Sequence, residues 1–156
     1  MATVTFSEKA RKEIAGQLHL LLANEYVLYT KTQKFHWNVE GKWFGPLHQL
    51  FENQYQELAD IVDKVAERSL QLGIKTIGTL TEFLKLTSLQ EAPGKNPSDT
   101  KMIEILLLDH EAVIEQIREH IDLTAQLNDM GTNNFLCDLI ERHEKIAWML
   151  RAHLAK

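Results

Sequence analysis

The sequence contains one cysteine, no long apolar run and few glycines or prolines, and each scarcity excludes a class of protein. The lone Cys137 cannot form an intrachain disulfide, which favours a reducing compartment. No stretch approaches the roughly 18 apolar residues of a membrane span, and the N-terminal MATVTFSEKARKE lacks the apolar core of a signal peptide. We therefore expect a soluble, cytoplasmic protein with no membrane partner.

Composition and charge narrow the choice further. A chain of 156 residues that is 44% apolar can bury an ordinary core without disulfide or metal staples, so we expect residues 1–156 to form a single domain. The formal net charge of -5 opposes strong binding to nucleic acid, which a basic face usually mediates. Cations are the charged partners that this composition favours.

Apolar residues recur at helical spacing in four long segments. We expect N-caps at Ser7, Ser98 and Thr132, and Gly73 is the expected stop after the second segment. Pro46 suits the first turn of that second segment. The four predicted helices cover residues 7–36, 46–72, 98–127 and about 132 onward.

The connections between these segments indicate how the helices are arranged. Those between the first and second helices and between the third and fourth are short, which favours antiparallel pairs. The connection over residues 73–97 is too long for a hairpin loop and contains TLTEFLKL, which could form a short helix. The sequence therefore predicts an all-α four-helix bundle with a short helix in the long crossover between the second and third helices.

Four metal-binding residue types share one stripe of the second predicted helix. At about 100° per residue, placing His48 at 0° puts Glu52 near 40°, Asp63 near 60° and Glu67 near 100°. The rise of about 1.5 Å per residue separates Glu52 from Asp63 by roughly 16 Å, so one chain cannot close this stripe around one metal ion.

A two-fold axis beside the middle of this helix would solve the problem. It would bring His48 and Glu52 of one subunit to Asp63 and Glu67 of its mate, and His36 could complete each of two identical sites. Two imidazoles and three carboxylates suit iron, manganese or zinc. The broad apolar arc of the helix also suggests that it contacts more than its own bundle.

A solvated acidic face explains the same stripe on spacing alone. The chain contains no Glu-x-x-His motif of the kind that ferritins use to place a metal site inside one subunit. The remaining histidines show no comparable arrangement, so we assign no role to His19, His110, His120, His143 and His153.

Residues 36–73 resemble the signature of the Dps family, the twelve-subunit mini-ferritins. They read HWNVEGKWFGPLHQLFENQYQELADIVDKVAERSLQLG, and the match includes HWNV, His48 and the segment DKVAER. The resemblance implies a ferritin-like bundle, assembly into a dodecamer, and two iron positions per inter-subunit site. The implied metal ligands and catalytic residues are His36, His48 and Glu52 of one subunit with Asp63 and Glu67 of its two-fold partner.

The resemblance also implies an activity. The expected function is that of a ferroxidase and iron-storage protein that oxidises Fe(II), preferably with hydrogen peroxide or otherwise with dioxygen, and sequesters Fe(III) in a hollow shell, protecting against oxidative damage. Many family members have Asp where this chain has Glu52, which could alter the second iron position. Trp37 would lie beside the site, and the implied acidic pores have as candidate residues Asp129, Asp138, Glu141 and Glu144.

Two other functions stay open. The first is a non-enzymatic DNA-condensing stress protein, since some Dps proteins bind DNA through lysine-rich tails; the sequence shows no such tail, so we do not expect strong DNA binding. The second is an oligomeric scaffold or surface-binding protein in which the acidic stripe only solvates a subunit interface.

Overall fold

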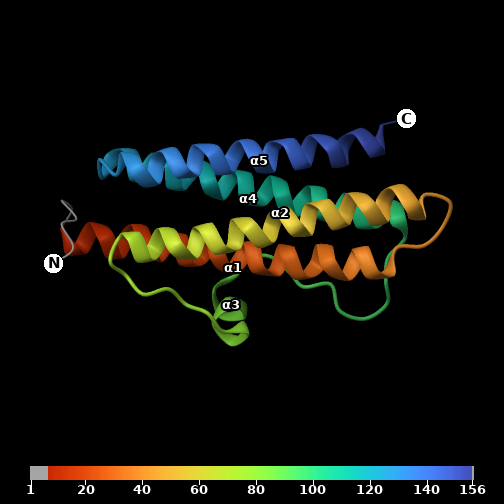
Figure 1. Cartoon of the computed structure of the whole chain (residues 1–156), viewed down its shortest axis with the longest axis horizontal. Helices are drawn as coiled ribbons and strands as arrows, with labels where there is room; N and C mark the ends of the chain where they lie inside the picture. Colours follow the sequence, from red (N-terminus) through yellow and green to blue (C-terminus); the bar gives the residue numbers. More distant parts are fainter. Residues whose placement is uncertain (1–6, 156) are drawn as a thin grey trace.

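The computed structural model describes residues 7–155 and confirms the predicted all-α architecture (Figure 1). The remaining residues of the predicted domain, 1–6 and 156, lie outside the described residues, and they include the start of the N-terminal segment MATVTFSEKARKE, which is predicted not to be a signal peptide. None of the helices within 7–155 is long and apolar enough to cross a membrane. The helices are α1 (Glu8–Asn38), α2 (Phe44–Gln71), α3 (Leu80–Leu86), α4 (Asp99–Gln126) and α5 (Met130–Leu154).

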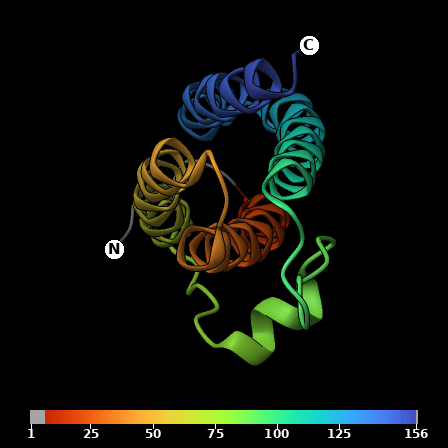
Figure 2. The same cartoon turned by 90° about the vertical axis from the view of Figure 1, so that its right-hand side faces the viewer.

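The four long helices surround one apolar core. In the view along the bundle, α1, α2, α4 and α5 form a ring and the short α3 lies outside it (Figure 2). Helix α1 packs mainly against α2, and α4 mainly against α5, while α1 also contacts α3 and α4. This is the predicted bundle with a short helix in its crossover, and the largest buried side chains include Phe35, Phe51 and Leu58.

Helix boundaries mostly follow the predicted signals. Ser7 and Ser98 are N-caps whose hydroxyls accept hydrogen bonds from the amides three residues on. Gly73 follows α2 with φ +75°, a conformation in which a Cβ would be strained, so it stops the helix as expected. Helix α2 begins two residues before Pro46, which is compatible because proline breaks no intrahelical hydrogen bond in a first turn.

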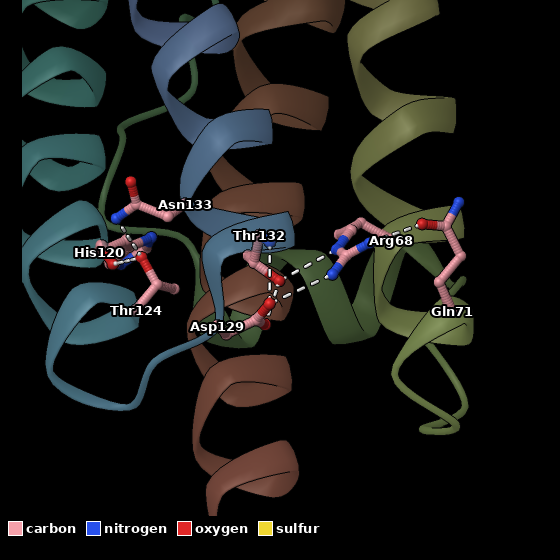
Figure 3. A network of polar contacts seen from close by, with 7 residues as sticks. All are labelled: Arg68, Gln71, His120, Thr124, Asp129, Thr132 and Asn133. Atoms are coloured by element: carbon pink, nitrogen blue, oxygen red, sulfur yellow. Dashed lines mark hydrogen bonds and ion pairs between the residues drawn. The ribbon is translucent and has the colours of Figure 1, made fainter. Parts of the chain in front are cut away.

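The predicted cap of the last helix is wrong. Asp129, not Thr132, is the N-cap of α5: its carboxylate accepts a hydrogen bond from the Thr132 amide at 3.0 Å and another from the Thr132 hydroxyl. Arg68 of α2 donates to the Thr132 hydroxyl at 3.0 Å and lies 3.4 Å from the carboxylate, which is 1% exposed (Figure 3). Of the candidate pore residues, Asp129 therefore has a structural role inside the subunit and does not line a pore.

The long crossover is fastened to α1 by buried polar contacts. The side-chain oxygen of Asn24 accepts hydrogen bonds from the Thr87 hydroxyl at 2.7 Å and the Ser88 amide at 2.8 Å. Further along α1, Lys34 donates to the carbonyls of Ala92 and Gly94. These contacts fix the path of the crossover beside α1.

The broad apolar arc of α2 is mostly buried inside the subunit. Leu50, Phe51, Ile61 and Val65 are all buried in the core, and only Val62 of that arc remains partly exposed. The arc therefore does not by itself indicate contact beyond the bundle, because the bundle covers most of it, and contact of α2 with a second subunit stays a prediction.

Candidate metal centre

His36 and His48 lie face to face at one end of the bundle. Their ring centroids are 3.9 Å apart with 21° between the planes. The two are reciprocally hydrogen-bonded: Nδ1 of His36 donates to the His48 carbonyl at 2.8 Å, and Nδ1 of His48 donates to the His36 carbonyl at 2.9 Å. Because a carbonyl only accepts, both rings carry their proton on Nδ1 and present the lone pair on Nε2.

This tautomer is the one that metal sites require. A histidine ligand normally donates its other ring N–H to a carbonyl or carboxylate, which fixes the ring and leaves one nitrogen free to bind. His36 is 7% exposed and His48 is half-buried, so both rings are held by packing as well as by hydrogen bonds. The two rings are therefore held in place, each with a free lone pair on Nε2.

The short connection between α1 and α2 creates this pair. Helix α1 ends at Asn38 and α2 begins at Phe44, so His36 occupies the last turn of one helix and His48 the second turn of the next. Leu47, 2% exposed, anchors the start of α2 in the core. The Phe44 ring stacks on His48 with centroids 5.0 Å apart and covers the outer side of the pair.

The three carboxylates occupy the same helix at different levels. Glu52 lies one turn after His48, half-buried, and its carboxylate accepts a hydrogen bond from Gln49 at 3.4 Å. Asp63 and Glu67 lie three and four turns further along α2 and are both exposed. The structure thus brings His36 and His48 together, places Glu52 one turn after His48, and leaves Asp63 and Glu67 open to solvent.

Within residues 7–155, no three His, Cys, Asp or Glu side chains converge so that they could hold a metal ion by themselves. The chain alone supplies two imidazole nitrogens, with the Glu52 carboxylate one helical turn from His48, and these N/O donors suit a divalent transition metal but leave its coordination incomplete. Additional ligands from another molecule would complete it.

Tyrosine and tryptophan side chains surround this end of the bundle. The Tyr55 ring meets His36 edge-on with centroids 5.2 Å apart. Trp37 follows His36 directly but is 65% exposed, so it is not packed in the subunit core. A search of the sequence for metal-binding residue types does not find Tyr55 as part of the site, although Tyr55 lies one turn from Glu52 on the same helix.

A buried polar cluster in the middle of the bundle also escaped the sequence analysis. Nδ1 of His110 lies 2.9 Å from Nδ1 of His143 in a hydrogen bond, and Nε2 of His143 lies 2.8 Å from the Glu25 carboxylate, although this contact is poorly aligned for hydrogen bonding. Burial, and then the neighbouring His143, holds the pKa of His110 well below its ordinary value. The one sequence signal is Glu25 itself, an acidic residue inside the mostly apolar stretch LLLANEYVLY.

Comparisons with known proteins agree with the fold. A family profile described as a ferritin-like domain matches residues 15–156. The structure resembles that of the Dps protein from Vibrio cholerae O1, described as a member of a broad superfamily of ferritin-like diiron-carboxylate proteins, with a TM-score of 0.93 and 31% identity over 99% of this chain and 98% of that one. Fold and site together therefore define a ferritin-like protein.

Sequence relatives identify the branch of that superfamily. A low temperature-induced protein from Nostoc sp. is 41% identical over 152 residues, covering 97% of this chain and 85% of the relative. DNA protection during starvation protein 2 from Bacillus anthracis is 35% identical over 143 residues, covering 92% of this chain and 97% of the relative. The chain belongs to the Dps family.

Proposed function

We propose that this protein is a ferroxidase and iron-storage mini-ferritin that oxidises Fe(II), preferably with hydrogen peroxide, and retains Fe(III) inside a hollow homo-oligomeric shell, which we propose to be a dodecamer. Residues 1–156 act as one domain in this proposal. Its substrates are Fe(II) and peroxide, and its effect is to remove the two reactants that together release hydroxyl radical.

The observation that carries the proposal is the fixed tautomer of the histidine pair. Both Nδ1 atoms donate to backbone carbonyls, so both Nε2 lone pairs are free, which is the arrangement that metal-binding histidines normally adopt. Glu52 on the next turn adds a carboxylate. We propose that two Fe(II) ions bind here per site.

The remaining ligands come from a two-fold partner in this proposal. Asp63 and Glu67 are exposed on the face of α2 that also carries His48, which supports their use by a second copy of the chain. A two-fold axis beside the middle of α2 would place them against the histidines of the mate and generate two equivalent sites. The single chain lacks a three-ligand group among residues 7–155, as this arrangement requires.

The proposed chemistry is a two-electron reduction of peroxide. Two Fe(II) ions each lose one electron, the O–O bond of hydrogen peroxide breaks, and two hydroxide ions form. The carboxylates stabilise Fe(III) relative to Fe(II) because hard anionic oxygens interact more strongly with the higher charge. The histidines position the ions so that both electrons reach one peroxide, which avoids release of hydroxyl radical.

A specific observation also favours the alternative of DNA protection, since relatives carry the name DNA protection during starvation protein. Direct DNA binding is opposed by the net charge of -5, because phosphate repels a negative surface and binding depends on released counterions. We propose that protection here occurs through removal of Fe(II) and peroxide. Retention of DNA in a gel shift at physiological salt would support the alternative.

The activity is tested by mixing anaerobic protein with Fe(II), adding stoichiometric peroxide, and following ferric absorbance together with particle size. We expect rapid oxidation by a large oligomer, with the rate lost in His48→Ala while the particle size is unchanged. Oxidation no faster than in protein-free buffer would refute the proposed function and leave the scaffold reading.

A further inference from the structure

The chain contains three tyrosines, and all of them belong to one continuous series of ring contacts that begins at His36. Tyr55 lies 5.2 Å from His36 between ring centroids, Tyr29 lies 6.1 Å from Tyr55, and Tyr26 lies 5.9 Å from Tyr29. Every step is an edge-on contact. The series ends where Tyr26 stacks on Phe83 of α3, with centroids 4.5 Å apart.

The far end of this series reaches the acidic stripe. Tyr26 and Tyr29 line a groove of about 450 Å³ between α1, α2 and the crossover, and Asp63 lines the same groove. The tyrosine rings therefore connect the histidine end of α2 to the neighbourhood of a carboxylate that lies about four helical turns away along the helix.

We propose that Tyr55, Tyr29 and Tyr26 form a relay that carries one-electron oxidising equivalents away from the His36 end of the metal site. The inference rests on the proposed function, because it requires Fe(II) and peroxide at that site. Van der Waals contact between successive aromatic rings provides short steps for electron transfer, and a phenol is a side chain that can lose one electron together with its proton.

The relay matters when a site holds one Fe(II) instead of two. Hydrogen peroxide then receives one electron from Fe(II) and the second from Tyr55, whose O–H bond breaks as the O–O bond of peroxide breaks. The products are Fe(III), one hydroxide ion, one water molecule that takes up the phenol proton, and one tyrosyl radical. No hydroxyl radical escapes, and a later Fe(II) with one proton from water restores the tyrosine.

The hydrogen bond to Tyr29 suits this role. The Gln33 side-chain amide donates to the Tyr29 hydroxyl oxygen at 3.2 Å, so the oxygen is an acceptor before oxidation and remains one as a phenoxyl radical. The contact survives the loss of the phenol proton. In the proposed dimer, Asp63 serves the second site, so the far end of the relay lies beside a place where fresh Fe(II) binds.

Freeze-quench electron paramagnetic resonance tests the relay on the whole assembled protein. We expect one Fe(II) per site plus one equivalent of peroxide to give a radical signal whose hyperfine structure collapses when the protein contains ring-deuterated tyrosine. Tyr55→Phe should abolish this signal and raise the yield of a hydroxyl-radical spin adduct. With two Fe(II) per site, Tyr55→Phe should oxidise iron at the wild-type rate.

Trp37→Phe is the matched control, since it removes the other aromatic residue beside His36 and should leave the tyrosyl signal intact. If the wild-type protein oxidises Fe(II) rapidly but its radical is insensitive to deuterated tyrosine or persists in Tyr55→Phe, the relay is refuted while the ferroxidase stands. If wild-type protein oxidises Fe(II) no faster than buffer, the proposed function fails and the relay fails with it.

Discussion

Substitution of His48 by asparagine or by glutamine separates the two roles of this ring, which are the hydrogen bond donated by Nδ1 and the metal binding proposed for Nε2. The amide nitrogen of asparagine falls near the position of Nδ1 and can keep the hydrogen bond to the His36 carbonyl, but nothing replaces Nε2. Glutamine reaches toward the position of Nε2 but loses the donor at Nδ1. The hydrogen bond from Nδ1 of His48 to the His36 carbonyl is 2.9 Å long, which leaves the free lone pair on Nε2.

The expected magnitudes differ between binding and folding. Loss of a hydrogen bond that orients a ligand costs roughly 10- to 100-fold in metal affinity, so loss of the ligand atom in His48→Asn should cost at least about 100-fold, or about 2.7 kcal/mol. Folding responds the other way, because His48→Gln loses a hydrogen bond worth about 1 kcal/mol, whereas His48→Asn keeps it.

Anaerobic calorimetry with a redox-inert divalent ion, Co²⁺ or Zn²⁺, measures the affinity, and urea unfolding at fixed chain concentration measures the stability. The two variants should therefore exchange their order between the two assays: His48→Asn weaker in metal binding, His48→Gln weaker in folding. Wild-type metal affinity in His48→Asn would refute the assignment of Nε2 as a ligand.

Two further predictions concern the fold. Asp129→Ala removes the cap of α5, worth about 1 kcal/mol, and leaves the mostly buried Arg68 without its carboxylate, worth about 1 to 3 kcal/mol. Urea unfolding should therefore show a loss of about 2 to 4 kcal/mol in the free energy of unfolding, and Asp129→Asn should lose less. Equal losses in the two variants would contradict the ion pair between Asp129 and Arg68. Burial lowers the pKa of His120 to about 4, so the unfolded chain binds a proton near pH 6.5 that the folded chain refuses, and stability that is complete above that pH is lost as pH falls toward 4. His120 alone should account for about 2 kcal/mol between pH 7 and pH 5 in urea unfolding, and a His120→Gln variant with the same pH dependence as wild type would contradict this account.

The sequence predicts the helices well because helical periodicity and end signals are local. Ser7, Ser98 and Gly73 act through contacts within a few residues, so their roles can be recognised without tertiary information. Residue type favours Thr132 as a cap, yet Asp129 competes better because its carboxylate also binds Arg68 from a distant helix. Only the fold reveals that partner.

The candidate site likewise has features that local sequence signals predict and others that depend on tertiary packing. Helical spacing alone placed His48 and Glu52 on one face, whereas the reciprocal hydrogen bonds that fix the ring tautomers depend on how α1 and α2 pack. Contacts such as Tyr55 with His36 and His110 with His143 join residues far apart in the chain, and no periodic pattern marks them. The use of Asp63 and Glu67 by a second subunit remains a prediction, since one chain cannot display it.

The most direct test of the inter-subunit site is co-assembly of two inactive variants. His48→Ala removes the histidine half of each site and Asp63→Ala the carboxylate half, so each alone should lose rapid Fe(II) oxidation. After the two are unfolded and refolded together at equal amounts, half of the two-fold pairs are mixed, and each mixed pair contains one intact site, so about one quarter of the wild-type activity should return. If the mixed assembly stays as inactive as its components, although mixed pairs are shown to form, the ligands do not come from two subunits and the proposed site is wrong.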